Sequence, residues 1–195
     1  MTVKPWAREA RVGSYLLLAG ATGAAAAYAL KAPWEVPVGL GAVALLGCFL
    51  LHQAYARWRG KYIEKRAIGS LSWPEGWIAT PNLGLPGGGD VDLLVEAPTG
   101  ERFAIEIKAM RDVEVKVPFM GLGRPRIVTK AGRRVREDPV AQARAAAQAV
   151  EARPVLWFPE GRGRAFKRRG EDLMVVFGSG PKLQRALGLR RWSWF

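Results

Sequence analysis

Asp92, Glu106 and Lys108 have the residue types that metal-dependent hydrolysis of a phosphodiester requires. Carboxylates and backbone carbonyls bind hard divalent cations, so Asp92, Glu106 and the carbonyl of Ile107 could hold Mg²⁺ or Mn²⁺. Such a metal activates the attacking water and polarises the phosphoryl oxygen. Lys108 follows Glu106 by two residues, so both side chains would project from one face of a strand. There Lys108 would position the water and stabilise the developing charge.

The same spacing also has a purely structural interpretation. A glutamate and a lysine two residues apart often form an ion pair on the solvated face of an antiparallel sheet. Phe103, Ile105 and Ile107 would occupy the opposite face, which indicates a core strand, where an acid needs a partner or a metal. Spacing alone leaves both interpretations open, and the preceding aspartate, a glycine loop and nearby basic segments favour the catalytic one.

The elements that would position these residues begin with an amphipathic pattern over 57–71, which predicts a helix. A short strand is expected at 77–80, and Pro and Gly residues predict a loop over 81–89. Residues 91–96 predict a strand, and the turn APTGE joins it to a second strand over 102–110, in which Phe103, Ile105 and Ile107 alternate with Ala104, Glu106 and Lys108. Asp92 and the Glu106–Lys108 pair would therefore lie on one hairpin.

Further elements are expected after this hairpin. Residues 111–137 form a basic, glycine-punctuated excursion, interpreted as another hairpin. Asp138 suits the N-cap and Pro139 the first position of a helix that ends before Pro154. Two strands and a closing helix are then expected, at 155–158, 172–177 and 181–187. This order predicts an α/β fold in which a mixed sheet is flanked by helices.

Two uncharged apolar runs, 12–30 and 36–56, come before these elements. A helix needs roughly 20 apolar residues to cross a bilayer, so each run predicts a transmembrane helix and together they predict a hairpin. A cleaved signal peptide and a soluble helical hairpin are the alternatives. The chain would then consist of a membrane segment, 1–56, and a soluble domain, 57–195.

Basic residues predict the orientation of this hairpin. They flank its outer ends, whereas the connecting loop has only Lys31, offset by Glu35. The positive-inside rule then places both termini and the soluble domain in the cytoplasm, on a two-pass inner-membrane protein. The single cysteine, Cys48, excludes an intramolecular disulfide and fits a reducing compartment.

The segment GGGDVDLLVEAPTGERFAIEIKA resembles the core of the PD-(D/E)xK nuclease superfamily, and specifically the nuclease-related domain NERD. The resemblance extends over roughly residues 57–190. It implies a restriction-endonuclease-like fold and Mg²⁺- or Mn²⁺-dependent phosphodiester hydrolysis. The matching positions, in chain order, are Glu64 on the leading helix, Asp92, Glu106, Lys108, and Pro139 and Gln142 on the later helix.

Some of these matches have alternatives. Glu64 could be a solvated glutamate among basic neighbours, and Gln142 an ordinary exposed helix residue rather than one that holds a ligand or water in the site. Leu93 follows Asp92 where the family often has histidine, a departure expected to affect detail rather than the metal site.

The net charge of +13 indicates a polyanionic partner. Two basic groups would contact nucleic acid, expected to be DNA: Arg124, Arg126, Lys130, Arg133, Arg134 and Arg136 in the first, and Arg162, Arg164, Lys167, Arg168 and Arg169 in the second. Phosphate contacts give affinity without sequence reading. The anionic inner leaflet would attract the same residues, so the second group could serve either partner.

Three functions are consistent with these patterns. The first is a membrane-anchored nuclease that acts on DNA at the cytoplasmic face, and a homodimer would suit cutting of both strands. The second is a catalytically inactive nucleic-acid-binding module on the same anchor. The third is a membrane scaffold whose basic groups bind lipids and protein partners. Only the first predicts metal-dependent cleavage that Asp92→Ala abolishes.

Overall fold

The computed structural model describes residues 5–86, 88–116, 126–129, 138–162, 166–167 and 173–189. Its contacts divide the chain into two units, Met1–Tyr62 and Ile63–Phe195. The boundary lies within the second helix.

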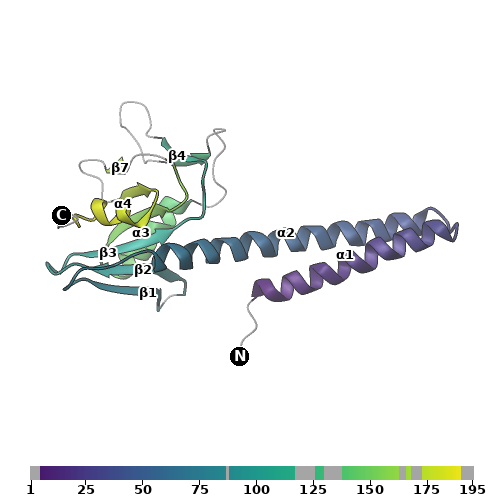
Figure 1. The fold of residues 1–195 in the computed structure, drawn as a ribbon, viewed down its shortest axis with the longest axis horizontal. Coiled ribbons are helices and arrows are strands. Elements are labelled where there is room, and N and C mark those ends of the chain that lie inside the picture. Colours follow the sequence, from purple (N-terminus) through teal and green to yellow (C-terminus); the bar gives the residue numbers. More distant parts are fainter. Residues whose placement is uncertain are drawn as a thin grey trace, which may run out of the picture. The chain divides into compact units, whose positions relative to one another are not determined.

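The first unit holds two antiparallel helices, α1 (Pro5–Ala29) and most of α2 (Glu35–Gly69) (Figure 1). Both are long and apolar enough to cross a membrane. Few residues of either apolar stretch are buried, so the chain itself does not cover these side chains as it would in a soluble core. The separate helix predicted over 57–71 is instead continuous with α2, because no residue after position 56 breaks the helix before Gly69.

Glycines allow the two helices to approach closely. A Cβ added at Gly20 would lie 2.5 Å from the backbone nitrogen of Ala44, and one added at Gly47 would collide with the backbone of Leu17. Small residues at such positions let membrane helices pack backbone against backbone. By contrast, a Cβ at Gly41, on the same helix, would meet no atom within 4 Å.

These contacts give a prediction for the hairpin. Gly47→Ala should lower the free energy of unfolding by about 1–3 kcal/mol, because the added methyl group forces the helices apart. Gly41→Ala should leave stability unchanged or raise it slightly, because alanine favours the helix. Thermal unfolding of the full chain in detergent, followed by circular dichroism, compares the two variants. Equal melting temperatures would show that the close approach contributes nothing.

The second unit is built on a six-stranded mixed sheet in the order β1-β2-β3-β6-β8-β7. Strands β3, β6 and β8 run parallel to one another, and the other neighbours are antiparallel. The bounds are β1 Ile78–Gly84, β2 Asp90–Glu96, β3 Arg102–Ile107, β6 Arg153–Phe158, β7 Phe166–Lys167 and β8 Met174–Phe177. The predicted α/β class with a mixed sheet is confirmed.

Two strand boundaries differ by three residues or more from those predicted. β1 continues through Pro81 to Gly84, where a loop was expected, because an edge strand tolerates a proline that donates no hydrogen bond. β3 ends at Ile107 rather than at Met110. The backbone nitrogen of Met110 donates a hydrogen bond to the carbonyl of Lys108, so the chain turns after Ile107 and the strand ends.

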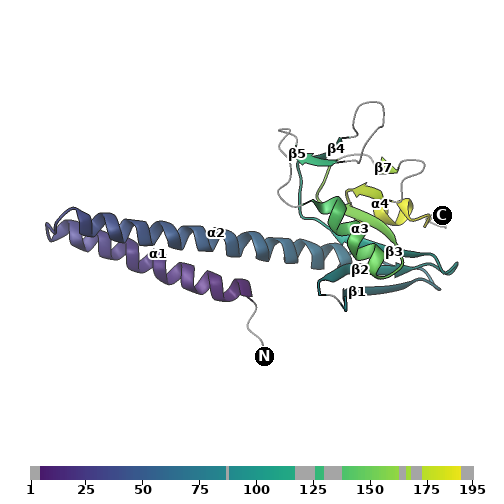
Figure 2. The ribbon, with the colours of Figure 1, turned by 180° about the vertical axis from the view of Figure 1, so that it is seen from behind.

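Helices cover both faces of the sheet (Figure 2). On one face, Val140 and Ala143 of α3 (Pro139–Ala149) pack in a cluster with Leu156 and Phe158. On the other face, Leu183 of α4 (Gly180–Ala186) packs in a cluster with residues that include Ala67, at the end of α2, and Trp157 of β6. Alternate residues of β6 therefore contact opposite layers.

The predicted excursion after β3 contains an antiparallel pair, β4 (Val113–Lys116) and β5 (Arg126–Thr129). Val113 and Ile127 of this pair are buried against the layer that includes α3. Most of the two predicted DNA-binding groups lies outside the described residues: Arg124, Lys130, Arg133, Arg134, Arg136, Arg164, Arg168 and Arg169. Arg126 lies in β5 and Lys167 in β7, and Arg162 is exposed after β6.

Candidate functional site

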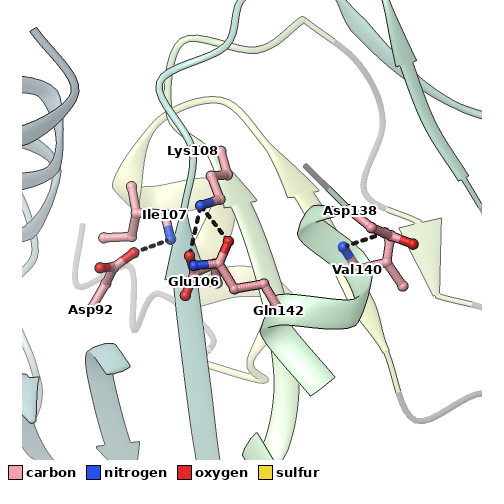
Figure 3. A network of polar contacts seen from close by, with 7 residues as sticks. All are labelled: Asp92, Glu106, Ile107, Lys108, Asp138, Val140 and Gln142. Carbon is pink, nitrogen blue, oxygen red and sulfur yellow. Dashed lines mark hydrogen bonds and ion pairs between the residues drawn. The ribbon is translucent and has the colours of Figure 1, made fainter. Parts of the chain in front are cut away.

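The site lies where β2 and β3 stop pairing. Their antiparallel register runs from Glu96–Arg102 to Leu93–Ile105. At Asp92, the residue of β2 directly before Leu93, the carboxylate accepts a hydrogen bond from the backbone nitrogen of Ile107 at 2.7 Å (Figure 3). The Asp92 side chain thus bonds directly to the strand that carries Glu106, as the predicted hairpin requires.

Glu106 is the only charged side chain that is buried in the described part of the chain, with 5% of its surface exposed. Lys108 donates from Nζ to the Glu106 carboxylate at 2.8 Å and to Oε1 of Gln142 at 2.8 Å. The expected placement of Glu106 and Lys108 on one face is therefore confirmed (Figure 3). A buried carboxylate is costly without a partner, and Lys108 supplies one.

A second Glu-x-Lys sequence provides an internal comparison. Glu114 and Lys116 of β4 repeat the spacing, but their side chains are 48% and 58% exposed and 3.6 Å apart. The Glu114–Lys116 pair therefore fits the structural interpretation, an ion pair on a solvated strand face. Such an exposed ion pair contributes little to stability. In the first pair, Glu106 is buried and Lys108 is 21% exposed and bonded to Gln142 of α3, so the two pairs differ in environment rather than in spacing.

The N-terminus of α3 positions Gln142. The Asp138 carboxylate accepts hydrogen bonds from the backbone nitrogens of Val140, at 3.1 Å, and Ala141, at 3.3 Å, and Pro139 occupies the first turn. This cap confirms the predicted helix start. Gln142 lies one turn into the helix, and although its side chain is exposed, it contacts Lys108. The structure therefore brings Gln142 to the site.

Burial raises the pKa of Asp92 from 3.8 to about 7, and the neighbouring Glu106 carboxylate adds to this effect. The hydrogen bond from Ile107 and the charge of Lys108 oppose it, and the Glu64 carboxylate raises it further. Glu64 is therefore close enough to act on Asp92 electrostatically, as its place on the leading helix suggested. Excess negative charge of this kind is what a cation would relieve.

The donor set is small for a metal centre. Among the described residues, no three aspartate, glutamate, histidine or cysteine side chains gather closely enough to hold an ion. Asp92 and Glu106 supply two carboxylates, and the Ile107 carbonyl, directly after Glu106 in the chain, could supply a third oxygen. Mg²⁺ commonly binds one or two carboxylates and completes its shell with water, so these residues fit such a metal.

The structure also contains a hollow of about 370 Å³ that the sequence did not indicate. Its lining includes Ile63, Arg66, Ser70, Pro159, Ser179 and Pro181. The run GSGP, directly after a buried strand, was the available signal, since Gly and Pro there allow a sharp turn at the sheet edge.

Comparisons with protein-family models, curated proteins and solved structures give no match to this chain. The fold and site define an α/β domain with a mixed sheet, a buried Glu-Lys pair and an adjacent aspartate of raised pKa.

Proposed function

We propose that this chain is a membrane-anchored, metal-dependent nuclease whose domain has a restriction-endonuclease-like fold of the NERD type. The observation that carries the proposal is the arrangement at the end of β3. There the buried Glu106 carboxylate is paired with Lys108, and Asp92, with its raised pKa, bonds the intervening residue. The net charge of +13 favours a polyanion such as DNA as the substrate.

Each residue of the site has a role in the proposed hydrolysis. Asp92, Glu106 and the Ile107 carbonyl would hold Mg²⁺ or Mn²⁺, which supplies Lewis-acid activation of water and phosphate. Lys108, held by Glu106 and Gln142, would position the attacking water and stabilise charge on the phosphoryl oxygens. Glu64 adds negative charge beside Asp92 and so favours a bound cation.

A catalytically inactive DNA-binding module is the second candidate. Asp92 already accepts a hydrogen bond from Ile107, and Glu106 is already neutralised by Lys108. These two contacts would stabilise the hairpin even if no metal bound. Such a module would bind DNA in a salt-dependent manner, as the nuclease would, but would not cut it.

The experiment is cleavage of single- and double-stranded DNA by the full chain in detergent, with Mg²⁺ or Mn²⁺ and with EDTA. The proposal predicts cutting that requires the metal and is lost in both Asp92→Ala and Lys108→Ala. Binding without cutting, unchanged by both substitutions, would favour the inactive module instead.

The contact with Gln142 gives a smaller effect. Gln142→Leu should lower the cleavage rate about tenfold, because Lys108 loses one of its two hydrogen-bond acceptors and is held less firmly. Gln148→Leu, an exposed position further along α3, is the matched control and should leave the rate unchanged. Rates measured under single-turnover conditions compare the two variants. Equal cleavage rates for Gln142→Leu and Gln148→Leu would show that Gln142 does not contribute to catalysis.

The membrane anchor is part of the same proposal. α1 and α2 have the length and composition of membrane spans. Where basic residues begin on α2, the Trp58 ring stacks on Tyr62 and meets the Tyr55 ring at a tilt. Aromatic and basic residues at that place suit the cytoplasmic interface of an inner membrane. The chain should remain in the membrane pellet after an alkaline wash, and proteolysis of inverted vesicles should reach residues 63–195. Release by the wash would contradict the anchor.

A further inference from the structure

The hollow lies at the carboxyl ends of β6 and β8, within the second unit. Pro159 and Glu160 follow β6, and Ser179 and Gly180 follow β8. The last turns of α2 complete the wall with Ile63, Arg66, Ala67 and Ser70. Crevices at the carboxyl ends of parallel strands are where α/β proteins commonly bind ligands. A volume of about 370 Å³ falls within the range of small-molecule sites.

Its lining combines positive charge, hydroxyl groups and apolar surface. Arg66 is exposed and makes no ion pair with any described residue, whereas the Glu160 carboxylate accepts hydrogen bonds from Nε and Nη2 of Arg111, at 3.0 and 3.2 Å. The charge of Arg66 is therefore not offset within the hollow. The Ser179 side chain makes no capping hydrogen bond, so its hydroxyl is available to a ligand. Ile63 and the two prolines provide apolar surface for a ring.

The hollow and the proposed catalytic site lie at the same end of the sheet, on opposite faces: the hollow on the face that α2 and α4 cover, and Lys108 with Gln142 on the face that α3 covers. Trp157, which lies in its wall, pairs with Ile107 across the sheet, and its carbonyl accepts a hydrogen bond from the backbone nitrogen of Lys108 at 2.9 Å. Ile63 of the hollow directly precedes Glu64, whose carboxylate acts on Asp92. A ligand in the hollow would therefore lie one strand away from the backbone of Lys108, at the same end of the sheet as its side chain but on the other face.

We propose that this hollow binds a single unpaired nucleotide of the substrate strand, at the end of the sheet where the phosphodiester is cut. This inference rests on the proposed function for the identity of the ligand. Arg66 binds the phosphate as a charged donor, Ser179 binds the sugar or phosphate, and the apolar wall contacts the base. A pocket of this size holds one extruded base and excludes a base pair. The chain therefore prefers single strands and frayed ends over intact duplex.

The test measures binding of thymidine 5′-monophosphate to the full chain in detergent with EDTA, by isothermal titration calorimetry. Arg66→Gln should weaken binding about tenfold, since a charged hydrogen bond is lost. Ser179→Phe, at an exposed position on the rim, should abolish binding by filling the hollow. Arg185→Gln, an exposed arginine of α4 outside the hollow, is the matched control and should bind like the native chain.

Absence of binding to the native chain would overturn the inference, as would equal affinities of Arg66→Gln and Arg185→Gln. Because no metal is present, this readout is independent of cleavage. Binding that depends on Arg66 in a chain that cuts no DNA would support the nucleotide site and contradict the nuclease. Metal-dependent cleavage at equal rates on single strands and duplex, without nucleotide binding, would overturn the nucleotide site and leave the nuclease standing.

Discussion

Lys108→Met is expected to lower the rate of metal-dependent cleavage by roughly 10²-fold to 10⁴-fold, the usual contribution of a positioned proton-transfer or charge-stabilising group. It should also lower the free energy of unfolding by about 1–3 kcal/mol. Glu106 is 5% exposed and would lose the cation that offsets its burial. This loss of stability is smaller than for a fully buried ion pair, because Lys108 is 21% exposed and water screens the pair.

The second Glu-x-Lys pair supplies the control for this substitution. Lys116→Met removes the same type of side chain from a pair with the same spacing, but Lys116 and Glu114 are both exposed. It should change neither the cleavage rate nor the melting temperature appreciably. The double variant Glu106→Gln with Lys108→Met should recover much of the lost stability, since no buried charge remains, but none of the activity. Equal losses in Lys108→Met and Lys116→Met would refute the special role of the buried pair.

Asp92→Asn is expected to abolish cleavage and at the same time stabilise the metal-free chain. The pKa of Asp92 is about 7 in the folded state against 3.8 ordinarily, so the folded chain holds a proton there that the unfolded chain releases. The free energy of unfolding of the native chain should therefore fall as pH rises from about 4 to 7. A pKa shift of this size corresponds to a loss of about 2–4 kcal/mol in the free energy of unfolding. Asparagine resembles the protonated acid and can still accept from Ile107, so the variant avoids this loss.

Chemical unfolding of the full chain in detergent with EDTA, at pH 4 and pH 8, measures this effect. The two chains should have similar stability at pH 4, and the Asp92→Asn variant should be more stable at pH 8. Asp90→Asn, at an exposed position on the same strand, should follow the native chain at both values. If the free energy of unfolding of the native chain is the same at pH 8 as at pH 4, the fold does not disfavour the charged form of Asp92.

The hairpin and its three charged residues could be predicted because their information is local. Alternation over 102–107 placed Glu106 and Lys108 on one face, and the structure pairs them. Asp138 and Pro139 marked the start of α3 through a cap that depends only on neighbouring residues. The family resemblance suggested that Gln142 lies at the site and holds a ligand or water there. Its contact with Lys108 was not predicted, since 34 residues separate the two and no short pattern links them.

Features that depend on distant contacts were not predictable. Residues 57–69 extend α2 because the end of an apolar span does not break a helix. Pro81 is tolerated in β1 because that strand is at the edge of the sheet, which only the strand order reveals. The hollow forms where α2, β6 and β8 meet, and these segments are far apart in the chain. Environment also distinguishes Glu106–Lys108 from Glu114–Lys116, which share a spacing.

Mn²⁺ binding to the detergent-solubilised full chain, followed by electron paramagnetic resonance of the free ion, tests most directly whether Asp92 and Glu106 hold a metal. We predict saturable binding at pH 8 that Asp92→Asn and Glu106→Gln each weaken at least about tenfold, since each removes one charged ligand. Asp90→Asn should bind like the native chain. No saturable binding to the native chain, or equal binding by Asp92→Asn and Asp90→Asn, would contradict the metal site and with it the nuclease.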